Sequence, residues 1–271
     1  MRCMQQTLCR SDFDISFADD LSPTCRALLP EHISALGLEN VPGVVHTLPG
    51  SWRAEEGLVE GSFRPAGDIE VGVTLRDGGD EAMVTICFTN LGRNVWRDLQ
   101  SNVCVAMNHL PGSGGVHWAN RDFIPATIPL QREEHGRYWY STLAPANYKG
   151  LSADGWVTLH ADAADPRPEK LPPYPHLIGE ARDIIACAVK APQQDLFLYQ
   201  AWDVPCRRHA PFWGNACTHL QQCVAPVVEP GQAAVLSGRI GIFRGDWAGL
   251  MQHISRGNWS WDKGKPWTGV L

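Results

Sequence analysis

Residues 107–123 gather histidine, aromatic and charged side chains around a Pro-Gly-Ser-Gly-Gly turn. The residues there whose types could do chemistry are His109, His117, Trp118, Asn120, Arg121 and Asp122. Loops between strands display functional side chains, because the scaffold holds them in place while solvent reaches them. A histidine beside a carboxylate can serve as general acid or base near neutral pH, and Arg121 could bind a hydroxyl or a carboxylate. The alternative is a flexible turn whose exposed histidines have no role.

A second candidate segment, residues 206–223, could supply a zinc site of the Cys3His type. Its ligands would be Cys206, Cys217, His219 and Cys223, with His209 as a spare. The spacing lacks the usual pair of cysteines two residues apart, so buried thiols and a loop histidine are an alternative interpretation. His219 also follows the turn Trp213-Gly214-Asn215, from where it could face residues 109–122 across the mouth of a β-sandwich.

Tryptophan is unusually frequent, with 11 residues in the chain. Trp259, Trp261 and Trp267 lie in a polar tail, where exposed indoles could form a platform on which sugar rings stack. Trp139 and Trp156 lie in strand-like runs and are expected in a core instead. An interface between subunits would also accommodate the tail aromatics, so a homo-oligomer stays open.

The elements that must position these residues are mostly strands. Residues 68–77 and 81–90 alternate apolar and polar side chains around Asp77-Gly78-Gly79, which predicts a hairpin with one buried face. Further short strand-like runs follow between Gly, Pro and Asn turns, without alternating helices. The sequence therefore predicts an all-β fold, a large antiparallel β-sandwich with little helix. We expect a mixed N-terminal segment (1–50) and a sandwich domain (51–271) in one structural unit.

Two short helices are expected beside the strands. The first is a candidate within residues 24–37, broken by Pro30 and ended by Gly37. The second begins near the end of the chain, where Asp246 could cap a turn that runs through Leu250 to His253.

Composition limits the partners and the compartment. The formal charge of −6 argues against nucleic acid as the main partner, and the absence of a long apolar run argues against a membrane. Without an export signal, the nine cysteines are expected to be reduced in a cytoplasmic protein, with Cys87 and Cys104 buried as small apolar residues. Nucleotide-binding and common hydrolase motifs are missing, so we expect no cofactor.

Three stretches stand out for their turns: VTICFTNLGRNVWRDL (84–99), GNACTH (214–219) and VVEPGQAAVLSGRIGIFRG (227–245). Through their Asn-Leu-Gly and Pro-Gly turns, residues 52–245 resemble the galactose-mutarotase-like β-sandwich superfamily. In mutarotases two histidines and a glutamate transfer protons on the sugar ring. The resemblance implies the fold and a carbohydrate ligand, with His117 and His219 as the matching histidines and no clear match for the glutamate.

The first functional hypothesis is a sugar isomerase, epimerase or lyase that acts on a small-molecule carbohydrate. In it His117 and His219 exchange protons, Asp122 orients one of them, Arg121, Asn215 and His109 bind hydroxyls, and Trp118 and Trp213 stack on the ring. A non-catalytic carbohydrate-binding protein is the second hypothesis. The third is a metal-dependent β-barrel enzyme with His109, His117 and His219 as ligands.

Overall fold

The computed structural model describes residues 2–5, 10–16, 24–106, 124–129, 141–143, 156–158, 179–190, 196–213 and 217–255. The strands of this described part are β1 (Arg2–Gln5), β2 (Asp12–Ser16), β3 (Thr24–Leu36), β4 (Gly50–Glu55), β5 (Leu58–Ala66), β6 (Ile69–Asp77), β7 (Glu81–Asn90), β8 (Trp96–Ala106), β9 (Ile124–Pro129), β10 (Ser141–Leu143), β11 (Trp156–Thr158), β12 (Gly179–Lys190), β13 (Leu196–Trp213), β14 (Cys217–Val228) and β15 (Ala233–Arg244). One helix, α1 (Trp247–Ser255), follows them. Nowhere in these ranges does a helix reach the length and apolar character that a membrane crossing requires.

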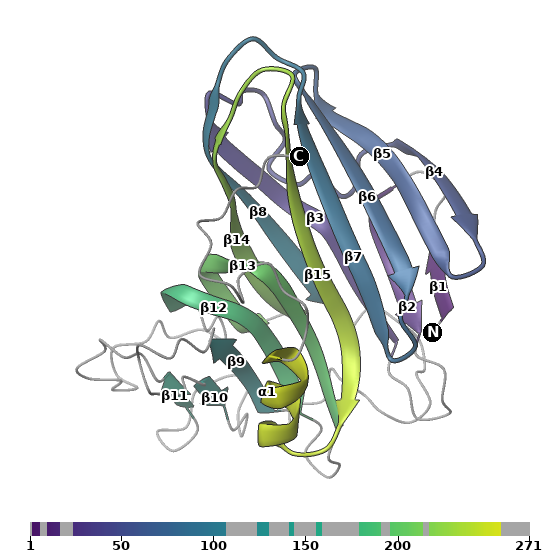
Figure 1. Ribbon diagram of the computed structural model, residues 1–271, viewed down its shortest axis with the longest axis vertical. Coiled ribbons are helices and arrows are strands. Elements are labelled where there is room, and N and C mark those ends of the chain that lie inside the picture. The colour runs from purple at the N-terminus through teal and green to yellow at the C-terminus, as the bar shows by residue number, and fades with distance from the viewer. Residues whose placement is uncertain are drawn as a thin grey trace.

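The strands form an antiparallel sandwich. The main ladder runs β1-β2-β3-β8-β14-β13-β15-β7-β6-β5-β4, and β12 and β9 extend from β13. In Figure 1 the strands β4 to β7 form one layer, and β3, β8 and β14 lie in the layer behind. The long strand β13 joins the layers, because its first half pairs with β15 and its second half with β14. The predicted all-β sandwich with little helix is confirmed.

The hairpin predicted from alternating residues is β6 and β7. On β6 the side chains of Ile69, Val71, Val73 and Leu75 are buried, and those between them are partly exposed. β7 pairs with β6 from Asn90 opposite Ile69 to Ala82 opposite Asp77. Side chains two residues apart lie on the same face of a strand, so the apolar residues of β6 share one face. Burial of this face stabilises the folded state by about 25 cal/mol per Å² of apolar surface.

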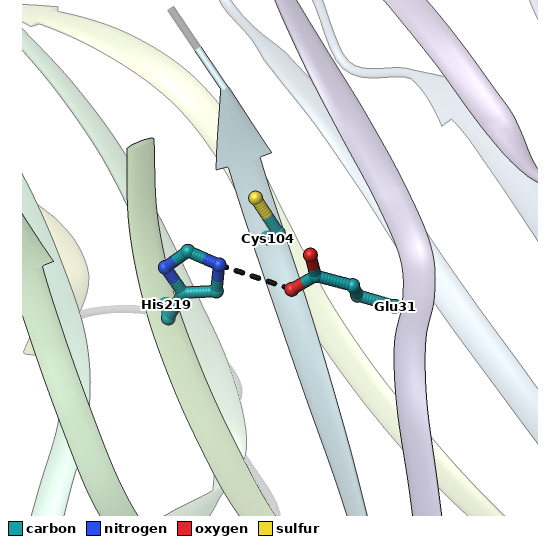
Figure 2. A group of neighbouring side chains, drawn as sticks. All are labelled: Glu31, Cys104 and His219. Atoms are coloured by element: carbon teal, nitrogen blue, oxygen red, sulfur yellow. Dashed lines mark ion pairs between the residues drawn. The ribbon is translucent and has the colours of Figure 1, made fainter. Parts of the chain in front are cut away.

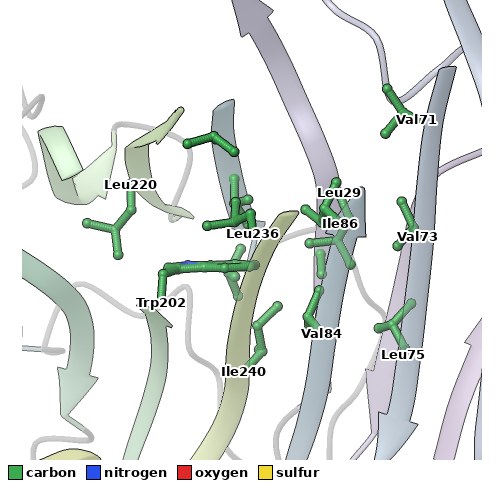
Figure 3. Packing of buried hydrophobic residues seen from close by; sticks show 14 of the residues in the cluster. Leu29, Val71, Val73, Leu75, Val84, Ile86, Trp202, Leu220, Leu236 and Ile240 are labelled. Carbon is green, nitrogen blue, oxygen red and sulfur yellow. The ribbon is translucent and has the colours of Figure 1, made fainter. Parts of the chain in front are cut away.

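The core lies between the two layers. Figure 3 shows residues of both layers in contact there, with the ring of Trp202 from β13 near Leu236 and Ile240 from β15. Trp202 is fully buried and lies opposite Gly238 in the register of β13 and β15. A Cβ atom at Gly238 would lie 2.3 Å from Trp202 Cε3, so only glycine leaves room for the ring.

One predicted helix is confirmed and the other is wrong. Asp246 caps α1, because its Oδ1 accepts a hydrogen bond of 2.7 Å from the Gly249 amide. Residues 24–36, in contrast, form the strand β3 between β2 and β8. Their inward side chains, Cys25, Ala27 and Leu29, alternate with a period of two, and pairing on both edges of β3 outweighs the weak helical pattern.

The turns that suggested a family resemblance contact each other through Asn90. This residue is fully buried, and its Nδ2 donates to the carbonyls of Val228 (3.0 Å) and Asn94 (2.9 Å). Its Oδ1 accepts from the Gly92 amide at 3.0 Å, and its backbone carbonyl accepts from Gly231 at 2.8 Å. Asn90 therefore joins the Asn-Leu-Gly turn after β7 to the Pro-Gly turn before β15.

Asp203 on β13 gives the first testable prediction. Burial raises the pKa of its carboxyl to about 6, although backbone hydrogen bonds, including one of 3.0 Å from Ser237, oppose the shift. The folded chain thus holds this proton to higher pH than the unfolded chain, so stability falls as pH rises from about 4 to about 6. Asp203→Asn removes this loss, and should gain up to about 3 kcal/mol on wild type between pH 4 and pH 7.

Urea unfolding of both proteins at several pH values measures this difference. Asp80→Asn, which changes an exposed carboxylate, is the control and should show no comparable trend. A stability difference between Asp203→Asn and wild type that stays constant with pH would contradict the prediction.

Candidate functional site

An irregularity in β3 brings a carboxylate to the neighbouring strand. Leu28 pairs with Cys104 and His32 pairs with Asn102, so four steps along β3 match only two along β8. The extra residues form a bulge, a feature that often redirects a side chain beside a functional site. Here the side chain of Glu31 reaches over β8, where Asn102 Nδ2 donates to Glu31 Oε2 at 3.1 Å.

Three strands place Glu31, Cys104 and His219 together, as Figure 2 shows. His219 of β14 pairs in register with Cys104 of β8. The neighbours Val103 and Leu220 belong to the core between the layers. Because side chains alternate along a strand, Cys104 and His219 lie on the opposite, outward face of this layer.

The central contact joins a carboxylate to an imidazole. His219 Nε2 lies 3.0 Å from Glu31 Oε2, and the side chains of both residues are largely shielded, with 14% and 18% exposed. His32 Nε2 lies 3.5 Å from the same oxygen, and its Nδ1 donates a hydrogen bond to the carbonyl of Gly43. The Nε2 atoms of two histidines therefore converge on one carboxylate oxygen of Glu31.

The charges around Glu31 favour its ionised form. Burial raises the pKa of Glu31, but the hydrogen bond and charge of His219 lower it, and His32 and His46 act in the same direction. The net Glu31 pKa lies below its usual range. Burial lowers the pKa of His46, which Asp12 and Glu31 only partly oppose. A carboxylate beside a histidine can accept a proton while the imidazole donates one.

Most predicted site residues lie outside the described residues. These are His109, His117, Trp118, Arg121, Asp122 and Asn215. Trp213 ends β13 and its backbone pairs with Cys217, and only His219 has a described side chain. His219 lies on β14 within the site, and its catalytic role stays a prediction.

The proposed Cys3His zinc site is only partly described. Side chains of Cys206 and Cys217 lie outside the described residues. His219 and Cys223 are four residues apart on β14, or about 13 Å along an extended strand, so one ion cannot bind both.

Cys104 is buried as predicted, at 2% exposure, whereas Cys87 is only partly buried.

Sequence reasoning missed Glu31, His32, Asn102 and Cys104. Glu31 and His32 were assigned to a helical candidate, and Asn102 and Cys104 to an ordinary strand. The available signal was the pair Glu31-His32 directly after Pro30, since proline within a strand-like run marks an edge or a bulge.

A second titratable cluster holds α1 against the sheet. Tyr199 donates a hydrogen bond to Glu81, and His253 Nε2 of α1 lies 3.0 Å from the Tyr199 hydroxyl and 2.5 Å from Glu81 Oε1. Arg239 Nη1 donates to Glu81 Oε2 at 3.3 Å. Burial raises the pKa of the Glu81 carboxyl, but these partners lower it by more, so its net pKa lies below the usual value. Burial and the neighbouring Glu81 raise the pKa of Tyr199 well above its usual value.

Tyr199→Phe tests whether this cluster stabilises the fold. Loss of the buried hydroxyl leaves Glu81 and His253 with one hydrogen-bond partner fewer, which should lower the free energy of unfolding by about 1–3 kcal/mol. Urea unfolding measures the loss, and amide hydrogen exchange in α1 should become faster. Unchanged stability together with unchanged exchange would show that the network contributes nothing to helix docking.

The chain matches solved structures over most of its length at low sequence identity. No family model matches the chain, and no curated protein matches it. A galactose mutarotase-like protein from Lactobacillus casei is 11% identical, and the match covers 90% of this chain and 100% of that one at a TM-score of 0.48. The structural neighbours include galactose mutarotase-like and aldose epimerase proteins.

Two further matches have the same character. A galactose mutarotase related enzyme from Lactobacillus acidophilus is 10% identical, with 89% of this chain and 97% of that one covered at a TM-score of 0.45. An aldose epimerase homologue from C. elegans is 10% identical, with 87% and 93% covered at 0.45. Both are of the kind that the turns in the sequence resemble, at sequence identities of 10%.

Proposed function

We propose that the chain is a sugar mutarotase or epimerase that transfers protons at the anomeric centre of an aldose. The observation that supports this is the contact of 3.0 Å between His219 Nε2 and Glu31 Oε2 on the outward face of the sheet. Proton transfer needs a base and an acid within reach of one reacting group, and this pair supplies both.

The proposed reaction opens the sugar ring. Glu31 takes the proton of the anomeric hydroxyl, the bond between the anomeric carbon and the ring oxygen breaks, and His219 gives a proton to that oxygen. The product is the open-chain aldehyde, which closes again with either configuration. Asn102 holds the Glu31 carboxylate in position through its hydrogen bond of 3.1 Å, and His117 stays the predicted second histidine.

Polarimetry of freshly dissolved α-aldoses, including glucose, galactose and xylose, tests this function. Wild type should accelerate the approach to the equilibrium rotation, and His219→Ala should return it to the uncatalysed rate. Gln221→Ala, two residues along the same face of β14, is the matched control and should keep the activity. Absence of acceleration by wild type with every aldose would overturn the proposal.

Carbohydrate binding without catalysis is the second candidate. A shallow cavity of about 500 Å³ on the other layer is lined by Trp52, Arg53, Glu60 and small polar residues, a combination suited to sugar hydroxyls. Under this alternative, wild type and His219→Ala would bind the same sugar equally in calorimetry, and neither would accelerate its mutarotation.

A further inference from the structure

We propose that Glu31, Cys104 and His219 form a binding site for a thiophilic divalent metal ion of the Zn²⁺ type, and that this ion inhibits the enzyme. Binding of the ion stands on the geometry of the three side chains alone. Inhibition rests on the proton transfer proposed above, because two of the ligands are the residues assigned to it.

The three ligand atoms are already close together. A carboxylate oxygen of Glu31, the thiol sulfur of Cys104 and a ring nitrogen of His219 lie within 4.8 Å of one another. Around a tetrahedral zinc ion such atoms are about 3.5 Å apart, given bonds of about 2.0–2.3 Å. Small rotations of the side chains would therefore complete three coordination bonds and leave a fourth position for water.

The surroundings of Cys104 combine apolar packing with two groups that can bind a metal ion. Cys104 is 2% exposed, and Leu28 and Ala106 pack around it. Its sulfur nevertheless lies within 4.8 Å of a carboxylate oxygen of Glu31 and a ring nitrogen of His219. Sulfur and nitrogen donors together with one carboxylate favour zinc over magnesium or calcium, which prefer oxygen alone.

The backbone and a neighbouring side chain hold the ligands in place. Cys104 and His219 are paired in register on adjacent strands, so their separation is fixed by the sheet. Asn102 Nδ2 donates to Glu31 Oε2 and orients the carboxylate, as partners outside the coordination sphere do in zinc sites. His32 Nε2 lies 3.5 Å from the same oxygen, so a second imidazole borders the cluster.

An ion at this point prevents proton transfer. The Cys104 thiol loses its proton to solvent when it binds the metal. The ion then replaces the contact between Glu31 and His219, and it occupies the oxygen and the nitrogen that would exchange protons with the sugar. Cys104 itself takes no part in the proposed reaction, so it can be changed to separate metal binding from catalysis.

Cobalt titration of untagged, reduced protein tests the site. One equivalent of Co²⁺ should produce a sulfur-to-cobalt charge-transfer absorption in wild type and in the matched control Cys87→Ala. Cys104→Ala should lose this absorption. Zn²⁺ should inhibit mutarotation by wild type and Cys87→Ala, with recovery on addition of a chelator, whereas Cys104→Ala should remain active in Zn²⁺.

The outcomes separate the two proposals. No absorption in wild type, or an unchanged absorption in Cys104→Ala, would overturn the metal site whatever the enzyme does. The expected absorption in a protein without mutarotase activity would leave the metal site in place and remove the proposed function. Mutarotation by wild type that is insensitive to saturating Zn²⁺ would overturn inhibition.

Discussion

Glu31→Gln is expected to lower the rate of aldose mutarotation by about 10²–10⁴-fold, the usual contribution of a general base. The amide keeps the shape of the side chain, and its oxygen can still accept the hydrogen bond from Asn102. It cannot take the proton of the anomeric hydroxyl. The loss should appear mainly in kcat, since the sugar still meets the same surroundings, and polarimetry at saturating sugar measures it.

The control for this variant is Glu70→Gln. Glu70 lies on β6 and forms an ion pair with Arg64 at 3.3 Å, far along the ladder from β3. Its replacement removes the same charge and should leave mutarotation unchanged. If Glu31→Gln retained the wild-type kcat while folded, Glu31 would not be the base, whereas an equal loss in both variants would point to the net charge.

The elements that sequence predicted well are those whose signal is local. The alternation in β6 and β7 needs only the pleat of a strand, and the cap at Asp246 needs only the first turn of α1. Each of these patterns arises from interactions among residues that lie within about ten positions of one another in the sequence. The resemblance to mutarotase-like proteins also rested on turns, and Asn90 shows why, because it joins two of them through buried hydrogen bonds.

The site depends on pairing between distant segments, which sequence alone does not show. Glu31 reaches His219 only because β3 pairs with β8 and β8 pairs with β14, and because the bulge in β3 redirects the carboxylate. Because residues 24–37 were predicted to be helical, no bulge between paired strands was expected there. Cys104 was predicted to be buried, and it is, but burial gave no sign that polar ligands would surround its sulfur.

Trp202→Leu is expected to cost several kcal/mol of unfolding free energy, because a fully buried indole at the centre of the sandwich is replaced by a smaller side chain. Large-to-small changes of this kind cost about 2–5 kcal/mol. The change also removes the hydrogen bond of 2.9 Å that Trp202 Nε1 donates to Gln200 Oε1. Urea unfolding measures the loss.

Gly238→Ala should destabilise the wild-type fold by about 1–3 kcal/mol, since its methyl group would lie 2.3 Å from the Trp202 ring. In the Trp202→Leu background the two ring atoms nearest to the new methyl group are gone, and the Ala201 carbonyl oxygen, 2.7 Å away, remains. The second change should then cost less than it does in wild type, which a double-mutant cycle measures. Gly72→Ala is the matched control, because its Cβ would meet only Cys87 Cβ at 3.8 Å and a carbonyl at 4.0 Å, and it should be tolerated. Strict additivity of the two changes would mean that the Trp202 indole is not the reason why position 238 requires glycine.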